Sequence, residues 1–269
     1  MRVVIAGSGG RMGQTLIEAI LAQQDLQFSG ALEIPGSALL DRDPGERFGR
    51  NTGVRISSDV ALALRDADVL IDFTRPEGTI AHAEACARAG VGAVIGTTGL
   101  SEANRDTLLT LSRDIPIVFA PNMSVGVNVL LRLVELAAPR LGDDYDVEIL
   151  EMHHRHKVDA PSGTALKLGE TVAAALGREL AADGVFVREG VTGARRPGSI
   201  GFATLRGGDV IGEHTVIFAG LGERIELTHK AASRMTFAQG ALRAARYVAA
   251  RRAAGETGLY DMRDVLGLH

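Results

Sequence analysis

The N-terminal half of the chain alternates short apolar runs with helical repeats, and this alternation constrains the fold more than any other feature. Residues 2–6 form an apolar run that ends at a glycine, and residues 10–24 repeat apolar side chains at helical spacing. Further strand-like runs follow at residues 26–32, 69–71, 92–95 and 115–120. Strands that alternate with helices form parallel sheets with helices on both faces. The first half therefore predicts a doubly wound parallel α/β sheet.

The pattern changes after Asn122, where an amphipathic helix, a strand and a second helix precede three strand-like runs. Gly207-Gly208-Asp209 and Gly220-Leu221-Gly222 are typical of hairpin turns between these runs. We therefore expect residues 1–124 to form one domain and residues 125–234 a smaller α+β domain with a mixed, mostly antiparallel sheet. The helix that closes the chain could belong to either domain, because its periodicity does not distinguish them.

A glycine-rich loop between the first predicted strand and helix is the clearest candidate binding site. Gly7, Gly10 and Gly13 allow a tight turn, a close approach of backbone to a pyrophosphate, and close packing of helix on strand. The helix N-terminus adds free N–H groups and the positive end of its dipole. Glu33, at the end of the second predicted strand, stands where an acid accepts hydrogen bonds from an adenosine ribose. These features favour a dinucleotide site over an ordinary strand–helix turn.

The residue after Glu33 bears on the choice of cofactor. Ile34 offers no cation to a 2′-phosphate, whereas Glu33 suits a free 2′-hydroxyl. Arg11 could contact either a 2′-phosphate or the pyrophosphate. We therefore expect NADH to be used at least as well as NADPH.

Two further loops follow apolar strands of the same predicted sheet. They are Gly96-Thr97-Thr98-Gly99 and Ala120-Pro121-Asn122-Met123. Loops at the carboxyl ends of parallel strands are where such sheets bind ligands, although both loops could also be plain connecting turns.

The densest polar stretch of the chain runs from Glu151 to Thr164 and holds three of the seven histidines. A metal site, a solvated basic strand end and an acid–base site are the three possible interpretations. No cysteine accompanies the histidines, and their spacing matches no familiar zinc motif, so no metal is expected. Ser162 can cap a helix whose first N–H groups, at Gly163 and Thr164, are suited to a carboxylate. This helix start favours an acid–base site for an anionic substrate.

Lysine is rare in this chain, because only three of its 29 basic residues are lysines. A lysine ammonium can donate a proton, whereas an arginine guanidinium stays protonated in proteins. Lys157 lies within the polar stretch and is therefore a candidate proton donor. The alternative is a surface lysine without a role.

Composition and charge exclude several classes of function. A net charge of −4 argues against a general nucleic-acid binder. No apolar stretch approaches the ~18 residues of a membrane span, and the N-terminal apolar run is too short for a signal peptide. Cys86 is the single cysteine, so no intrachain disulfide is possible. We expect a cytoplasmic protein that binds neither nucleic acid nor membranes.

Seven segments, in family order over almost the whole chain, resemble the 4-hydroxy-tetrahydrodipicolinate reductases, also called dihydrodipicolinate reductases. These segments are GSGGRMG (7–13), DFT (72–74), GTTG (96–99), APNMSVGVN (120–128), EMHHRHKVDAPSGTA (151–165), RGGDVIGEHTV (206–216) and ELTHKAASRMTFAQGA (226–241). The histidine-rich segment is highly specific, whereas many dehydrogenases share the glycine loop. The resemblance implies reduction of 4-hydroxy-tetrahydrodipicolinate to tetrahydrodipicolinate by NADH or NADPH, with loss of water, in lysine biosynthesis through diaminopimelate.

The same resemblance implies an architecture and a set of roles. It implies a Rossmann-type first domain completed by C-terminal helices at residues 235–269, and a homotetramer joined through the sheets of the second domain. His153 would donate or accept a proton, Lys157 would donate one, and His154, Gly163 and Thr164 would bind the carboxylates of the substrate. The implied cofactor-binding residues are Gly7, Ser8, Gly9, Gly10, Arg11, Met12, Glu33, Gly96, Thr97, Thr98, Ala120, Pro121, Asn122 and Met123.

Two positions depart from the family pattern. Ile34 stands where some members carry Arg, and Met123 stands where others carry Phe. The alternatives to this family are another two-domain dehydrogenase, of the aspartate or homoserine type, and a non-catalytic NAD-binding redox sensor. The first does not account for residues 151–165, and the second needs a DNA-binding element or partner surface that the sequence does not show.

Overall fold

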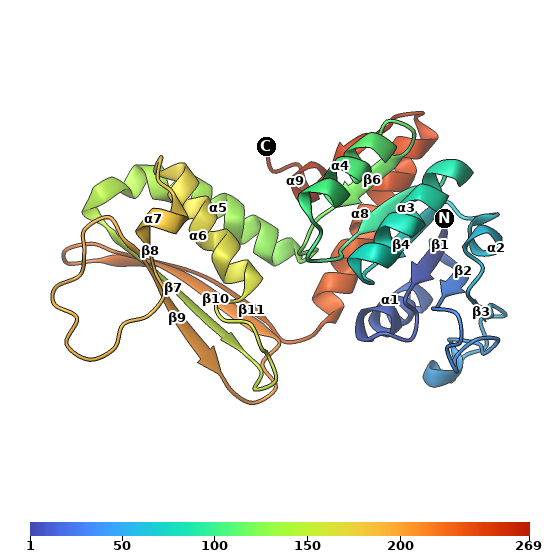
Figure 1. Ribbon diagram of the computed structural model, residues 1–269, viewed down its shortest axis with the longest axis horizontal. Helices are drawn as coiled ribbons and strands as arrows, with labels where there is room; N and C mark the ends of the chain where they lie inside the picture. Colours follow the sequence, from blue (N-terminus) through green and yellow to red (C-terminus); the bar gives the residue numbers. More distant parts are fainter. The chain divides into compact units, whose positions relative to one another are not determined.

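The chain divides into two structural units, and the computed structural model describes all of its residues, 1–269. The first unit comprises residues 1–125 and 234–269, and the second comprises residues 126–233. The N- and C-terminal segments therefore belong to one unit, drawn in blue to green and in red in Figure 1. None of the helices is long and apolar enough to cross a membrane.

A seven-stranded parallel sheet forms the centre of the first unit, in the order β12-β6-β5-β4-β1-β2-β3. This sheet confirms the fold class that the alternating pattern predicts. The strand order reverses at β1, which has β4 on one side and β2 on the other, and ligands of such sheets bind at this point. The strands are β1 (Arg2–Ala6), β2 (Gln27–Leu32), β3 (Ile56–Ser57), β4 (Val69–Asp72), β5 (Gly92–Ile95), β6 (Pro116–Phe119) and β12 (Gly258–Tyr260).

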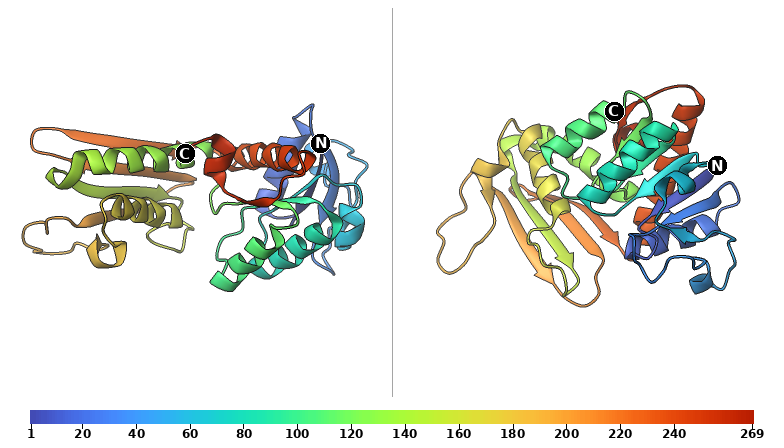
Figure 2. Two further views of the ribbon diagram at one scale, coloured as in Figure 1. Left: turned by 90° about the horizontal axis from the view of Figure 1, so that it is seen from above. Right: turned by 45° about the vertical axis from the view of Figure 1, so that its right-hand side comes forward.

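Helices cover both faces of this sheet because side chains alternate along each strand (Figure 2). Val3 and Ile5 of β1 share a buried cluster with α1 and α8, whereas Val4 and Ala6 share another with α2, α3 and α4. Each large aliphatic side chain buried in this way contributes about 1.5–3 kcal/mol to stability. The helices are α1 (Arg11–Leu21), α2 (Val60–Leu64), α3 (Pro76–Ala89), α4 (Glu102–Leu111), α8 (Met235–Ala253) and α9 (Met262–Leu266).

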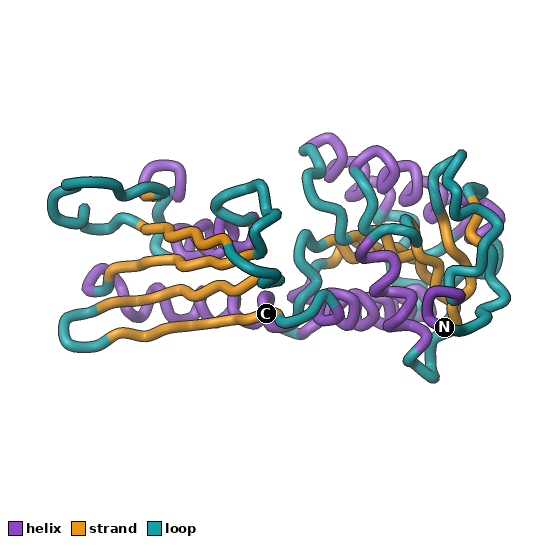
Figure 3. The backbone as a smooth tube through the Cα atoms, turned by 90° about the horizontal axis from the view of Figure 1, so that it is seen from below, coloured by secondary structure: helices purple, strands orange, loops and turns teal.

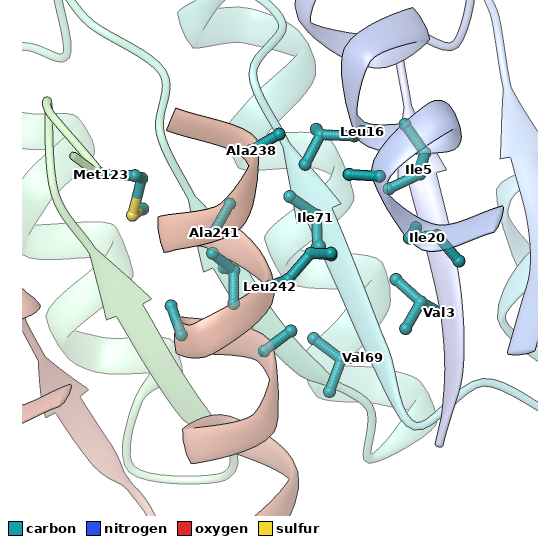
Figure 4. Packing of buried hydrophobic residues seen from close by; sticks show 14 of the residues in the cluster. Val3, Ile5, Leu16, Ile20, Val69, Ile71, Met123, Ala238, Ala241 and Leu242 are labelled. Atoms are coloured by element: carbon teal, nitrogen blue, oxygen red, sulfur yellow. The ribbon is translucent and has the colours of Figure 1, made fainter. Parts of the chain in front are cut away.

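Small residues let the C-terminal helix α8 lie close to the sheet. Ala241 faces the strands within the first buried cluster (Figure 4). A Cβ atom on Gly92 of β5 would lie 2.2 Å from Val248 of α8, and one on Gly240 would lie 1.7 Å from the carbonyl oxygen of Met123. Glycine at these two positions therefore allows α8 to contact β5 and the loop after β6.

A mixed five-stranded sheet forms the second unit, in the order β11-β10-β7-β9-β8 (Figure 3). Strand β10 pairs antiparallel with β7 and β11, whereas β9 pairs parallel with β7 and β8. The mixed sheet is as predicted, and β9 is parallel to β7 because a helical crossover connects them. The strands are β7 (Asp146–His153), β8 (Gly184–Val185), β9 (Ile200–Arg206), β10 (Gly212–Ala219) and β11 (Arg224–Ala231).

One of the two predicted hairpin turns is wrong. Gly220-Leu221-Gly222 does turn β10 into β11, and the N–H of Gly220 donates to the carbonyl of Glu223 at 2.9 Å. Gly207-Gly208-Asp209 instead connects β9 to β10 across β7, which lies between them. A glycine turn shows that the chain reverses, but it does not show which strand becomes the neighbour.

Helices α5 and α6 cover one face of the second sheet. Val147 and Ile149 of β7 share a buried cluster with Leu130 of α5 and Leu168 of α6. The polar residues at the end of β7 continue along this covered face, because strand side chains alternate with a period of two. The helices are α5 (Val125–Leu141), α6 (Gly163–Ala175) and α7 (Leu180–Asp183).

Candidate active site

The glycine loop after β1 is a tight turn that leads directly into α1. Gly7 has a φ of +68°, and its carbonyl accepts the N–H of Gly10 at 3.0 Å. A Cβ on Gly13 would lie 2.1 Å from that same carbonyl oxygen, so only glycine lets α1 begin this close to the strand. Ser8 is buried and bonded to the end of β2, and Met12 packs against the first buried cluster. No side chain caps α1, so its first N–H groups are available to an anion.

The carboxylate of Glu33 turns back onto this loop. Its Oε1 accepts the N–H of Gly9 at 2.6 Å, and a Cβ on Gly9 would lie 2.9 Å from the same oxygen. Arg11 is exposed at the start of α1, and Ile34 is 72% exposed beside the carboxylate. The structure thus brings Glu33 and the glycine loop together and leaves an aliphatic neighbour at position 34.

A buried aspartate ties the loop after β4 to the loop after β5. The Asp72 carboxylate accepts the N–H and the hydroxyl of Thr74, both at 2.7 Å, and pairs with His82 Nδ1 at 2.7 Å. Burial alone would raise the pKa of Asp72, but the bonds from His82 and Thr74 outweigh burial and lower this pKa. Thr97 Oγ1 lies 2.7 Å from Thr79 Oγ1 and 3.4 Å from the aspartate.

The two remaining loops lie at the same edge of the sheet. A Cβ on Gly96 would lie 2.1 Å from the Phe73 ring, so glycine lets the loop after β5 pass this side chain, and Thr98 is exposed beyond it. In the loop after β6, Asn122 Oδ1 accepts the N–H two residues on at 2.9 Å, and Met123 is buried. All residues predicted to bind the cofactor therefore lie at the carboxyl ends of β1, β2, β5 and β6.

In the second unit, β7 ends at His153, which shares its face with Glu151. His153 Nδ1 lies 2.6 Å from Glu151 Oε2, and the imidazole rings of His153 and His214 are 5.1 Å apart, edge to face. Burial lowers the pKa of His153, although the Glu151 carboxylate opposes this shift. Burial and the charge of His153 lower the pKa of His214 to about 4. Both imidazoles are therefore mainly neutral at pH 7.

The segment that carries Lys157 leaves the sheet as a loop after His153. The N–H of Lys157 donates to the carbonyl of His154 at 3.1 Å, and the rings of His154 and His156 are 6.2 Å apart. His154 Nδ1 is buried without a hydrogen-bond partner. The Lys157 ammonium donates to Asp159 Oδ1 at 2.7 Å, and its charge acts on His153.

Helix α6 begins beside this loop with the cap that the sequence predicts. Ser162 Oγ accepts the N–H of Ala165 at 3.2 Å and lies 2.9 Å from His214 Nε2. A Cβ on Gly163 would meet no atom within 4 Å, so open space lies over the first turn of the helix. Thr164 follows and is half-buried. No group of three or more His, Cys, Asp or Glu side chains is placed to hold a metal ion.

Comparison with known proteins decides the family. Residues 1–123 match the family described as dihydrodipicolinate reductase, N-terminus, and residues 126–266 match dihydrodipicolinate reductase, C-terminus. The chain belongs to the dihydrodipicolinate reductase family. This membership confirms the resemblance of the seven segments, and it makes the chain an NAD(P)H-dependent oxidoreductase.

Individual dihydrodipicolinate reductases match over their full length. The 4-hydroxy-tetrahydrodipicolinate reductase of Thiobacillus denitrificans is 58% identical, over 100% of this chain and 99% of that protein. The enzyme of the same name from Nitrosospira multiformis is 57% identical, over 100% and 98%. A dipicolinate-bound dihydrodipicolinate reductase from Paenisporosarcina sp. TG-14 has 26% identity and a TM-score of 0.75, over 97% of each chain. An amine dehydrogenase from Mycobacterium smegmatis, at 14% identity and a TM-score of 0.58, shares the fold alone.

Several polar residues of both units lay outside the sequence-based predictions. Asp72 ends an otherwise apolar strand, and His214 interrupts the apolar face of β10. Glu151 precedes His153 by two residues, so period-two alternation could have placed both on one face. His82 and Arg206 had no local signal, because only the tertiary fold brings them to their carboxylates.

Proposed function

We propose that this chain catalyses the NAD(P)H-dependent reduction of 4-hydroxy-tetrahydrodipicolinate to tetrahydrodipicolinate with loss of water, a step of lysine biosynthesis through diaminopimelate. The observation that carries the proposal is the arrangement after β7, where the buried His153, the Lys157 ammonium and the open N-terminus of α6 belong to one unit. Relatives that are 57–58% identical over the full length carry this reductase name.

The first unit fits a nicotinamide dinucleotide. The tight turn at Gly7 to Gly10 and the uncapped start of α1 suit a pyrophosphate, and the Glu33 carboxylate suits a ribose hydroxyl. Loops 96–98 and 120–123, at the same edge of the sheet, add further cofactor contacts. The bound cofactor supplies a hydride.

The second unit binds the substrate through groups that favour carboxylates. The N–H groups of Gly163 and Thr164 begin α6, where the helix dipole favours negative charge, and no side chain obstructs Gly163. The imidazole of His154 and the ammonium of Lys157 add donors on the adjoining loop. A dicarboxylate therefore meets donors from two elements of one unit.

Two side chains handle the proton of the reaction. Hydride addition to an imine-type ring leaves an electron pair that must be met by a proton at nitrogen or an adjacent centre. The Lys157 ammonium can give up this proton, whereas a guanidinium at the same place could only attract the substrate. His153 is held neutral by burial and can accept or donate a proton beside it.

The direct test is the oxidation of NADH by the purified protein, with and without the imine generated enzymatically. We expect NADH oxidation, measured as the loss of NADH absorbance, only when the imine is present. The rate should be much lower in Lys157→Ala and His153→Ala. Rapid NADH oxidation without the imine, or none with it, would overturn the proposed reaction.

We propose that NADH is used at least as well as NADPH. Ile34 is exposed beside Glu33, so a 2′-phosphate at this place would meet a carboxylate and no cation from position 34. Titration of the protein with each cofactor tests this directly. A strong preference for NADPH would show that another cation, with Arg11 the nearest candidate, binds the phosphate.

We also propose a cytoplasmic homotetramer whose subunits join through the open face of the second sheet. Leu205 of β9 is 47% exposed on this face, opposite α5 and α6, and the half-buried Leu150 lies on the same face. Sedimentation of the purified protein should give about four times the chain mass of 28.3 kDa. A monomer at assay concentration would contradict this assembly.

A further inference from the structure

The Glu151 carboxylate is buried, and each of its two oxygens has two polar partners. Its Oε2 lies 2.6 Å from His153 Nδ1 and accepts Arg206 Nη1 at 2.8 Å. Its Oε1 accepts Arg206 Nη2 at 2.8 Å and the N–H of Ser162 at 3.0 Å. Only 1% of this residue is exposed, so water does not replace any of these partners.

The protonation state of Glu151 sets the tautomer of His153. Burial would raise the pKa of Glu151, but the bonds from Arg206, His153 and Ser162 outweigh burial and lower this pKa. An ionised carboxylate can only accept hydrogen bonds, so His153 Nδ1 carries the hydrogen. The other ring nitrogen, Nε2, then holds the lone pair that can exchange a proton. A Cβ on Gly212 would lie 3.0 Å from this Nε2, so glycine keeps this side of the ring open.

The same carboxylate connects the elements that we assign to substrate binding. Through the N–H of Ser162 it holds the cap of α6, the helix that begins at Gly163, where an added Cβ would meet no atom within 4 Å. Through Arg206, which also donates to the carbonyl of Asp159 at 2.7 Å, it holds the loop that carries Lys157. A single side chain thus fixes the end of β7, the start of α6 and the loop between them.

We propose that Glu151, with Arg206, is a positioning residue for the reduction. It fixes His153 with the hydrogen on Nδ1, and it holds the start of α6 and the Lys157 loop in place. This inference rests on the proposed function, because it assigns a role within that reaction. Glu151 itself is not expected to touch the substrate.

Removing the negative charge of Glu151 should lower the pKa of His153. The groups that face His153 are Glu151 on its own strand, Arg206 on β9, His214 on β10 and Lys157 on the loop. Without the carboxylate only the cations and a neutral imidazole remain, so the pKa of His153 should fall.

The decisive variant is Glu151→Gln, which keeps the shape and removes the charge. We expect kcat to fall about 10- to 100-fold, the effect of losing an outer partner that fixes a histidine tautomer, while the Kd of NADH stays unchanged. The limb of the kcat pH profile that reports His153 should move to lower pH. The affinity for dipicolinate, measured calorimetrically, should also fall, because the start of α6 loses its anchor.

Asp25→Asn is the matched control. Asp25 belongs to the first unit, lies outside the residues placed in either site, and accepts two hydrogen bonds from the Arg246 guanidinium, at 2.7 Å and 2.9 Å. It therefore loses a carboxylate with a similar arginine partner, and we expect an unchanged pH profile and unchanged dipicolinate binding. An equal displacement of the profile in both variants would show a general loss of charge and would overturn the positioning role.

A second variant covers the case in which Glu151→Gln fails to fold because Arg206 is left unpaired. Glu151→Gln/Arg206→Met removes both charges, and it should fold and show a smaller displacement of the pH profile in the same direction, because the loss of Arg206 partly offsets the loss of Glu151. Wild-type kcat and an unmoved profile in either folded variant would overturn the inference while leaving the reduction intact. Failure of the proposed function is distinguishable, because the wild-type protein would then show no imine-dependent NADH oxidation.

Discussion

Replacing Gly163 by alanine separates substrate binding from the stability of α6. Gly163 is the first residue of this helix, its φ is not in the left-handed region, and a Cβ there meets no atom within 4 Å. Alanine loses less backbone entropy than glycine on entering a helix, by about 0.5–1 kcal/mol. We therefore expect the free energy of unfolding of Gly163→Ala to rise by about that amount in denaturant titrations.

The same methyl group occupies the space in which we place a substrate carboxylate. A hydrogen bond to a charged group contributes about 1.5–3 kcal/mol, and each 1.4 kcal/mol or so is a factor of ten in affinity. We expect the KM for substrate and the Kd for dipicolinate to rise about 10- to 100-fold. The Kd for NADH should not change, because the glycine loop belongs to the other unit.

Gly169→Ala is the control from the same helix. A Cβ on Gly169 would lie 2.5 Å from the Phe202 ring and 3.2 Å from Leu180, so the added methyl overpacks the core. Overpacking of this kind costs about 1–3 kcal/mol, and we expect a less stable protein with an unchanged KM. If Gly163→Ala binds dipicolinate as tightly as the wild type, no carboxylate lies at the start of α6 and the placement of the substrate is wrong.

Three further predictions concern single residues. Lys157→Arg should keep NADH binding and lose kcat by about 10²–10⁴-fold, and a rate near wild type would reduce Lys157 to an electrostatic clamp. Ile34→Arg should improve NADPH relative to NADH by about 1–2 kcal/mol in kcat/KM, and an unchanged ratio would mean that another cation binds the 2′-phosphate. The pKa of His214 in the folded protein is about 4, below its ordinary 6.5. As the pH falls from 6.5 toward 4, the unfolded chain therefore binds a proton at this residue and the folded protein does not, so stability is lost over this range. The free energy of unfolding, measured by denaturant titration at several pH values, should fall by about 3 kcal/mol over this range. In His214→Gln this free energy should depend less on pH.

The sequence predicted those parts of the site that are set by local chemistry. The glycine loop needs small residues within one strand–helix turn, and the cap at Ser162 needs only the start of the next helix. Glu33 was also predictable, because the length of one β–α–β unit places it at the end of the neighbouring strand. Each of these features depends only on the spacing of residues along the sequence.

The polar networks could not be predicted, because their partners meet only in the folded chain. Arg206 reaches Glu151 from 55 residues away, and His214 reaches Ser162 from 52 residues away. Both contacts depend on β9 and β10 lying on either side of β7. The expected hairpin at residues 207–209 would have placed β9 beside β10 and moved Arg206 away from the carboxylate.

The buried residues at the start and at the end of β7 affect the protein in different ways. Val147 and Ile149 are buried without polar groups, so their burial only stabilises the fold. Glu151 and His153 are almost as buried, and a buried charge is tolerated only when close partners compensate for the lost water. Removing one partner leaves the others unpaired, so substitutions in this network should alter rate and stability together. Gly163 lies outside the network, so Gly163→Ala should weaken substrate binding without lowering stability.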